Sequence, residues 1–242
     1  VYHFTTKAKS RQRYKKRKNY VYLYLRKRIK MIHTVIFDMG GVLVSLDRNR
    51  CIGSFRTEAG FESIGDFLDL FHQKGFIGDL EKGDITPDDF FNECIKRSRP
   101  GTTKEVVRDC FNSLLTGMVD DAVKLLMELH DNYDICILSN NNPISRGWFK
   151  DHLISEYGIG CEGYFKKEFY SYEMRILKPS PEIYRRVIDT LGCKPEEILF
   201  IDDSVTNAEA ARAAGITPLW LQPGMNISEE VHKLLNNEKT LS

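Results

Sequence analysis

The stretch VIFDMGGVLV, residues 35–44, is the starting point for interpreting this 242-residue sequence. Its first three residues are apolar, Asp38 follows them directly, and Gly40 stands two residues later. A short apolar run that ends abruptly in a polar residue is typical of a fully buried strand in a parallel sheet. The stretch therefore predicts a buried strand with Asp38 at its carboxyl end.

The same pattern occurs twice more, in YDICILSN (133–140) and EILFIDD (197–203). Amphipathic helical segments occur at 120–132, 180–192 and 207–216, and TPLWLQ after the last of them is a further expected strand. Strands that alternate with helices predict an α/β fold with a doubly wound, mostly parallel sheet.

Residues 47–118 interrupt this alternation. They contain several helix-like segments, with Gly and Pro punctuation and no convincing strand. We therefore predict a small helical cap inserted after the first strand, and a core formed by residues 31–46 and 119–242. An insert at this point lies over the crevice in which open sheets bind ligands, so the cap is a candidate lid.

The first 30 residues differ from the rest in charge. They hold twelve Lys or Arg and no acidic residue, which leaves 23 basic against 34 acidic residues in 31–242. A basic arm that binds nucleic acid or anionic lipid is one interpretation. We favour another, in which Met31 is the natural start and residues 1–30 are disordered or an over-extended reading of upstream sequence. No nucleic-acid partner is expected for the acidic body.

Composition points to an ordinary globular protein, with 42% hydrophobic and 29% charged residues. The apolar run at 20–25 is far shorter than the roughly 20 residues of a membrane span, and it lacks the flanks of a signal peptide. The six cysteines form no C-x-x-C pair, so we expect no disulfide framework and a cytoplasmic location. Nothing in the sequence indicates an oligomeric state.

Polar residues follow the expected strands or lie in the loops after them. Each taken alone has an ordinary explanation as a helix cap, a turn or a solvated loop residue. A doubly wound sheet, however, brings such loops together at one crevice, where carboxylates, a hydroxyl and an ammonium would meet. The residues are Asp38, Ser139, Asn140, Lys178, Asp202 and Asp203.

Four segments carry a resemblance to a known family. FDMGGVLV, ILSN, LKPSPEIY and FIDDSVTNAEAARAAGI resemble, in order and spacing, the four motifs of the haloacid dehalogenase-like (HAD) superfamily. The predicted helical insert stands where that family has its cap, so the resemblance implies a Rossmannoid core. The D-x-G of the first motif and GDLEKGDIT in the cap are similar to bacterial phosphatases acting on α-D-glucose 1-phosphate.

The resemblance implies a nucleophile and a metal site. Asp38 would attack phosphorus and form an aspartyl phosphate that water then hydrolyses. A carboxylate and a phosphate dianion repel each other, and Mg²⁺ with hard oxygen ligands would relieve the repulsion. Asp38, the backbone carbonyl of Gly40 and Asp203 are the implied ligands. Asp202 is either a further ligand or an orienting carboxylate.

The resemblance also implies how a phosphorylated small molecule would bind. Ser139 and backbone N–H groups around Asn140 would donate hydrogen bonds to the phosphoryl oxygens, and Lys178 would balance their charge. In the cap, His72, Lys74, Asp79 and Glu81 are candidate contacts to sugar hydroxyls, although such residues more often form the solvated face of a helix and its loop.

Gly40 departs from the usual pattern of the family. Most of its phosphatases have an aspartate there that protonates the leaving oxygen and activates water, a contribution of about 10²–10⁴-fold. Three interpretations follow. In the first, the enzyme is slowed by this loss; in the second, another group or an easily expelled leaving group compensates for it. In the third, the protein only binds phosphate. We favour the second interpretation, with a substrate such as glucose 1-phosphate. Asp47 is a speculative substitute, and a cap for the helix that follows it is its simpler role.

Two alternatives of other classes stay open at this point. A 2-haloacid dehalogenase also lacks the second aspartate and needs no metal, but the Asp202–Asp203 pair would oppose ionisation of its nucleophile. A non-catalytic binding protein on the same fold is the other, since fold does not imply function. The retention of Asp38, Ser139, Lys178 and Asp203 counts against it.

Overall fold

A computed structural model describes residues 32–68 and 74–237 of the chain. Its centre is a five-stranded sheet whose strands all run parallel. In spatial order the strands are β5 (Lys167–Tyr170), β4 (Asp134–Ser139), β1 (Thr34–Phe37), β6 (Ile198–Asp202) and β7 (Thr217–Trp220). The sequence predicted β1, β4, β6 and β7. The apolar runs of β1, β4 and β6 form the buried middle of the sheet, and β7 is an edge strand.

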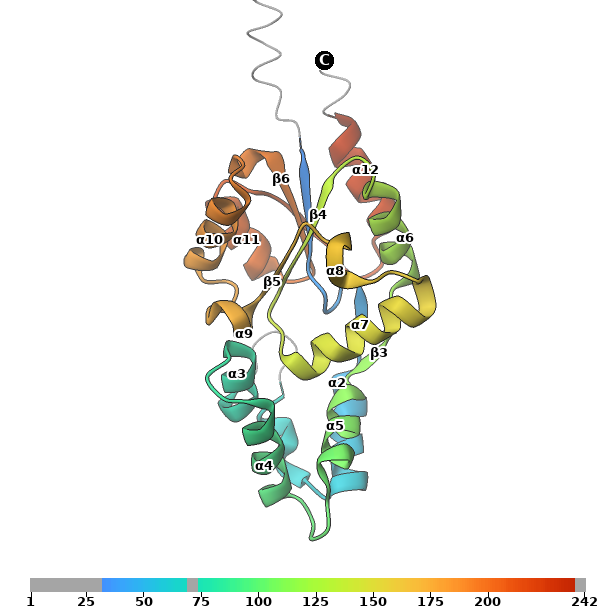
Figure 1. Cartoon of the computed structure of the whole chain (residues 1–242), viewed down its shortest axis with the longest axis vertical. Helices are drawn as coiled ribbons and strands as arrows, with labels where there is room; N and C mark the ends of the chain where they lie inside the picture. Colours follow the sequence, from blue (N-terminus) through green and yellow to red (C-terminus); the bar gives the residue numbers. More distant parts are fainter. Residues whose placement is uncertain (1–31, 69–73, 238–242) are drawn as a thin grey trace, which may run out of the picture.

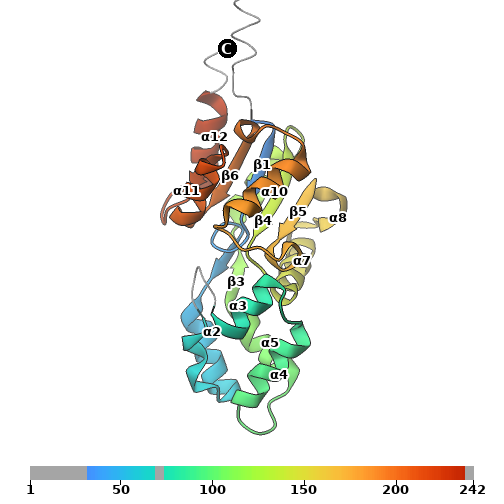
Figure 2. The ribbon, with the colours of Figure 1, turned by 90° about the vertical axis from the view of Figure 1, so that its left-hand side faces the viewer.

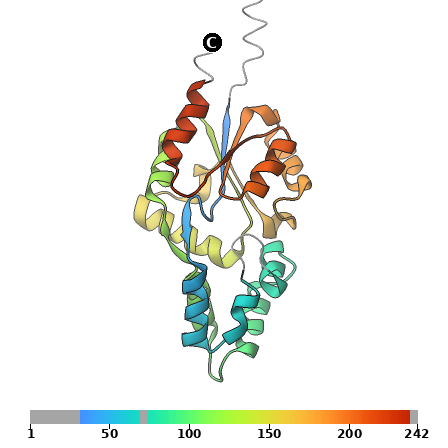
Figure 3. The same ribbon diagram turned by 180° about the vertical axis from the view of Figure 1, so that it is seen from behind.

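Helices cover both faces of the sheet (Figures 1 and 3). Side chains alternate along β1, so Val35 and Phe37 pack into one core cluster and Ile36 into another. The first cluster lies under α6 (Asp120–Leu129), α7 (Pro143–Tyr157) and α12 (Ile227–Asn237), and the second under α10 (Pro181–Leu191) and α11 (Val205–Ala213). The predicted doubly wound α/β fold is confirmed.

The cap is helical and has a core of its own. Its elements are α2 (Arg48–Ser54), η1 (Phe55–Ala59), η2 (Glu62–Asp66), α3 (Gly75–Lys82), α4 (Pro87–Arg97) and α5 (Lys104–Asn112). Buried aromatic rings fill its interior, among them Phe55, Phe61, Phe90 and Phe111. Threonine side chains cap α4 and α5 at Thr86 and Thr103. In Figure 2 the cap lies below the sheet and is joined to it by a narrow neck.

That neck contains a ribbon that the sequence did not predict. β2 (Val44–Leu46) pairs antiparallel with β3 (Leu115–Met118), so the expectation of no strand in 47–118 was wrong at its end. β3 reads LTGM, in which Thr and Gly break the apolar pattern. β5, with the sequence KEFY, was also missed, because its first two residues are charged and only its last two are buried.

The remaining short elements are α8 (Cys161–Tyr164), α9 (Ser171–Met174) and η3 (Pro195–Glu197). Within the described residues, no helix has the length and apolar character needed to cross a membrane. The basic leader (1–30) and His72 lie outside the described residues, so the expectations about them stay predictions.

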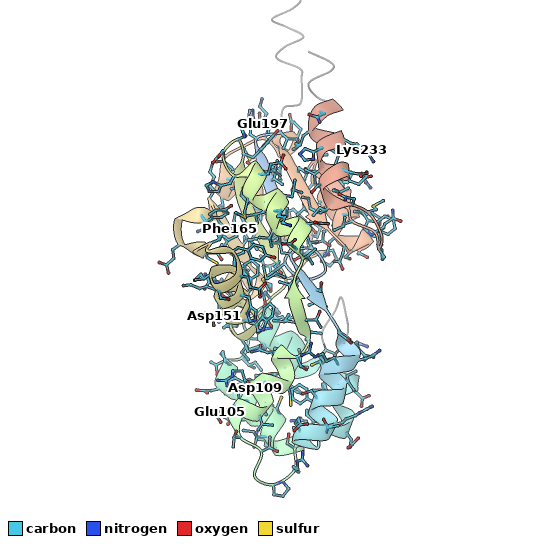
Figure 4. All side chains as sticks on the ribbon, turned by 90° about the vertical axis from the view of Figure 1, so that its right-hand side faces the viewer. Glu105, Asp109, Asp151, Phe165, Glu197 and Lys233 are labelled. Atoms are coloured by element: carbon cyan, nitrogen blue, oxygen red, sulfur yellow. The ribbon has the colours of Figure 1, made fainter. Side chains whose placement is uncertain are left out.

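The cap faces the carboxyl ends of the strands. Figure 4 shows Glu105 and Asp109 of α5 toward the cap end, whereas Glu197, directly before β6, and Lys233 of α12 lie toward the opposite end. The loops that follow the strands therefore lie between the core and the cap, which is the position predicted for the ligand crevice.

Core and cap meet closely along α3. The hydroxyl of Ser171 in the core donates a hydrogen bond of 2.6 Å to the backbone carbonyl of Glu81 in the cap. Two residues on, Gly83 has a left-handed backbone (φ 78°), and a Cβ there would overlap the carbonyl oxygen of Tyr172. A glycine at this point permits both the turn and the close approach of the two domains.

We expect Gly83→Ala to be more destabilising than Gly158→Ala. Both glycines end a helix in the left-handed region, but a Cβ at Gly158 would meet nothing within 4 Å. The control variant should lose about 1–2 kcal/mol from backbone strain. Gly83→Ala should lose more, because α3 must also move away from Tyr172. Urea unfolding of both variants measures the difference, and equal losses would contradict the close contact.

Candidate active site

The predicted polar residues converge on one cavity between the sheet and the cap. Asp38 follows β1, Ser139 ends β4, and Asp203 follows β6, and these are three adjacent strands. All three side chains line the cavity together with Lys178 and Asn140. Asp202, the last residue of β6, is fully buried and does not line the cavity.

Lys178 is the centre of the polar network. Its side chain is 1% exposed, and its Nζ lies 2.9 Å from Oδ2 of Asp38 and 2.7 Å from Oδ2 of Asp202. It also donates a hydrogen bond of 3.0 Å to the carbonyl of Leu138. Burial by itself lowers the pKa of Lys178, but Asp202 and Asp38 outweigh it and raise the pKa overall. Lys178 is therefore a fixed positive charge beside Asp38.

Asp202 has no oxygen left for another strong ligand. Oδ1 accepts hydrogen bonds from the backbone N–H of Ser204 (2.8 Å) and from Asn207 (3.0 Å), and Oδ2 accepts from Lys178. Of the two roles that the sequence left open, this geometry favours the orienting carboxylate over the metal ligand.

The side chain of Asn140 is bound to the protein backbone. It donates to the carbonyl of Lys178 (2.9 Å) and accepts from the N–H of Lys178 (2.8 Å). Asn140 therefore fixes the loop that carries Lys178. The hydroxyl of Ser139, by contrast, makes only a long 3.4 Å hydrogen bond, to the carbonyl of Asn140, among the residues described. Of the two, Ser139 has the side chain available for a ligand.

Two residues that the sequence did not single out, Asn142 and Gly41, also shape the site. Asn142 caps α7 by accepting from the N–H groups of Ile144 and Ser145. Gly41 has a left-handed backbone, and a Cβ there would overlap the carboxylate of Asp203. The run NNNP and the paired glycines of VIFDMGGVLV were the signals for these residues.

The candidate sugar contacts of the cap separate into two groups. Glu81 of α3 lines the cavity, whereas Lys74 and Asp79 are exposed and do not. Asp47 is exposed as well, and its carboxylate accepts from the N–H of Arg50 as the N-cap of α2. The simpler interpretation of Asp47 is confirmed, and this cap geometry removes it as a substitute at Gly40.

Several carboxylates lie close together at the site. One oxygen from each of Asp38, Asp202 and Asp203 falls within 4.8 Å of the others. Burial raises the pKa of Asp38 above its ordinary value, with Lys178 opposing the shift and Asp202 adding to it. Burial and Asp202 likewise raise the pKa of Asp203 to about 6. Burial and the charge of Asp38 raise the pKa of Glu81 to about 8. The repulsion within such a cluster of carboxylates is relieved either by protonation or by the binding of a cation.

We expect the metal-free protein to lose stability as the pH rises from about 4 to about 6. The pKa of Asp203 is raised from 3.8 to about 6 in the folded state, so in this window the folded protein holds more protons than the unfolded chain. The contribution of Asp203 to the free energy of unfolding therefore falls as the pH rises, and it becomes constant above the folded-state pKa of this group.

Melting temperatures in EDTA across this pH range test the expectation. Asp203→Asn should show a smaller fall than the wild type, and Asp79→Asn, which changes an exposed carboxylate, should behave like the wild type. A pH dependence unchanged by Asp203→Asn would contradict the carboxylate repulsion at the site.

Known proteins resemble this chain over most of its length. The family model of haloacid dehalogenase-like hydrolases matches residues 32–215. A D-ribitol-5-phosphate phosphatase from Bacteroides thetaiotaomicron is 28% identical over 86% of this chain and 100% of its own length. A sesquiterpene phosphatase from Aspergillus oryzae is 25% identical over 83% of this chain and 95% of its own.

Solved structures agree with this assignment. A HAD family enzyme from B. thetaiotaomicron, in complex with magnesium and inorganic phosphate, is 33% identical, with a TM-score of 0.76 over 82% of this chain and 98% of that one. The match of the family model covers well over half of the sequence and includes all four motifs. The chain belongs to the haloacid dehalogenase-like hydrolase family.

Proposed function

We propose that the protein is a Mg²⁺-dependent phosphatase of a small phosphorylated carbohydrate, with Asp38 as nucleophile. The observation that carries the proposal is the ion pair between Lys178 and Asp38 at the floor of the cavity. A nucleophilic carboxylate beside a fixed cation suits the attack on a phosphate dianion, whose transition state needs charge neutralisation and alignment.

The chemistry proceeds in two steps. An oxygen of Asp38 attacks phosphorus, the bond from phosphorus to the substrate oxygen breaks, and the alcohol leaves with a proton. Water then attacks phosphorus of the aspartyl phosphate, loses a proton, and releases phosphate and the free carboxylate. The hydroxyl of Ser139 would donate a hydrogen bond to a phosphoryl oxygen, and the positive charge of Lys178 would balance the charge of the phosphoryl group. The backbone N–H of Met39 donates to Oδ1 of Asp38 (2.7 Å) and orients it.

The residues present fit a magnesium ion. Asp38 and Asp203 supply hard carboxylate oxygens and Gly40 a backbone carbonyl, which is the ligand chemistry that Mg²⁺ prefers. The ion would supply positive charge against the phosphate. The magnesium and phosphate in the related B. thetaiotaomicron enzyme support this assignment.

The size of the cavity and the relatives together support a small substrate. The cavity measures about 90 Å³, far below the roughly 300–1,000 Å³ of pockets that enclose drug-sized ligands. The chain's resemblance to glucose 1-phosphate phosphatases and to a D-ribitol-5-phosphate phosphatase suggests two substrate types. The first releases an anomeric hydroxyl, and the second a primary alcohol, which is a poorer leaving group.

We expect Asp38→Asn to lower Mg²⁺-dependent p-nitrophenyl phosphate turnover by more than about a thousandfold, because the variant lacks the attacking carboxylate. Its melting temperature without metal should match or exceed that of the wild type, since a crowded negative charge is removed. Asp47→Asn is the matched control, because asparagine also caps helices, and it should keep wild-type activity. Undiminished turnover by Asp38→Asn, or metal-independent chloride release from a haloacid, would contradict the proposal.

A panel of phosphorylated carbohydrates with Mg²⁺ distinguishes the two substrate types. If the leaving group must be easily expelled, kcat/KM for hexose 1-phosphates should exceed that for pentitol and hexose phosphates with a primary ester. A preference for the primary esters would show instead that the enzyme protonates its leaving group. Equally low kcat/KM values for all members of the panel would contradict a carbohydrate substrate.

A further inference from the structure

Gly40 leaves the proposed phosphatase without an evident proton donor. A phosphatase that expels an ordinary alcohol gains about 10²–10⁴-fold from general acid–base catalysis. Gly40 lines the cavity but has no side chain, and Asp47 is occupied as a helix cap outside it. The group that moves protons must therefore come from another lining residue or from the substrate.

Glu81 lies in the required place. It belongs to α3 of the cap, and its side chain lines the same cavity as Asp38, Ser139 and Lys178. Asp38 and Ser139 reach the cavity from the core, and Glu81 reaches it from the cap. A leaving oxygen on the phosphorus would be directed away from Asp38, since attack and departure are in line. A proton donor from the cap, rather than from the strand ends that carry Asp38, suits this direction.

The backbone of Glu81 is anchored to the core. Its carbonyl accepts the 2.6 Å hydrogen bond from Ser171, and α3 approaches Tyr172 so closely at Gly83 that a Cβ would not fit. These two contacts fix the position of the Glu81 backbone relative to the core. A proton donor needs such fixed placement within hydrogen-bond reach of the reacting oxygen.

The carboxyl group of Glu81 is available for chemistry. No residue in the described parts of the chain donates a hydrogen bond to it, whereas Lys178 is held between two carboxylates. Among the lining residues described, it is the carboxyl that stands outside the proposed metal set of Asp38 and Asp203. Leu46, Phe111 and Leu114 line the same cavity, and apolar surroundings favour the protonated form of a carboxylic acid.

We propose that Glu81 is the general acid and base of the reaction, in the role for which Gly40 has no side chain. Its carboxyl gives a proton to the substrate oxygen as the bond to phosphorus breaks. The resulting carboxylate then takes a proton from the water that attacks the aspartyl phosphate, which restores the acid. The inference rests on the proposed phosphatase function and adds the residue that would allow a primary alcohol to leave.

The test compares full-length wild type and Glu81→Gln in Mg²⁺ by rapid quench, with p-nitrophenyl phosphate and with D-ribitol 5-phosphate. Nitrophenolate leaves without a proton, so the first-step burst should keep its wild-type rate. The first step with ribitol phosphate should slow by about 10²–10⁴-fold. Hydrolysis of the phosphoenzyme should slow with both substrates, so that phosphoenzyme accumulates with p-nitrophenyl phosphate, whose first step is unchanged. Glu62→Gln, at an exposed cap glutamate outside the cavity lining, should match the wild type.

Two results would overturn the role of Glu81. One is wild-type turnover of ribitol phosphate by Glu81→Gln with no accumulation of phosphoenzyme. The other is an equal slowing of the first step with both substrates, which would indicate a structural effect. Failure of the phosphatase proposal is distinguishable, because then the wild type itself would form no phosphoenzyme with either substrate.

Discussion

The buried ammonium of Lys178 is the interaction on which the site depends. It stands 2.9 Å from Asp38 and 2.7 Å from Asp202, and all three groups are shielded from water. Removing Lys178 would leave two buried carboxylates uncompensated, and the loss of the partner of a buried charge typically costs about 3–5 kcal/mol. The loop before α10 and the ends of β1 and β6 are therefore locked to one another by charge, and Asn140 adds the end of β4 through the backbone of Lys178.

The arrangement leaves one negative charge in excess before Asp203 is counted. Asp203 adds a further carboxylate, and Gly41 is what lets it come so close to the first motif. A site with this charge is unfavourable when empty and deprotonated, and a divalent cation relieves it. The same imbalance supports the proposed function, since a cation that relieved the repulsion in the empty site would also neutralise a bound phosphate.

Local pattern predicted the strands that carry an apolar run and failed where polar residues or glycine interrupt it. Val35–Phe37 and the run before Ser139 are continuous apolar segments, whereas β5 and β3 carry Lys, Glu, Thr or Gly and depend on tertiary pairing. The gathering of Asp38, Ser139, Lys178 and Asp203 could be predicted because parallel strands place their carboxyl ends at one edge. The hydrogen bonds of the Asn140 and Asp202 side chains could not be predicted, since they depend on how side chains from different loops lie relative to one another.

Glu81 shows the same limit for the cap. A helical cap was expected, but nothing local distinguishes Glu81 from the exposed Asp79 two residues earlier. The difference arises from the contact of α3 with Ser171 and Tyr172 in the core, which are 90 residues away in the sequence. The proposed substitute for the side chain missing at Gly40 belongs to the cap, so the first motif by itself could not identify it.

The most direct test of the account is to identify the phosphorylated residue in a single turnover. Wild-type protein mixed with Mg²⁺ and excess p-nitrophenyl phosphate, quenched in acid within milliseconds and digested, should yield one phosphorylated peptide. Tandem mass spectra should place the phosphoryl group on Asp38, the residue paired with Lys178. Rapid product formation without a phosphorylated peptide, or a phosphoryl group on any other residue, would contradict the central claim.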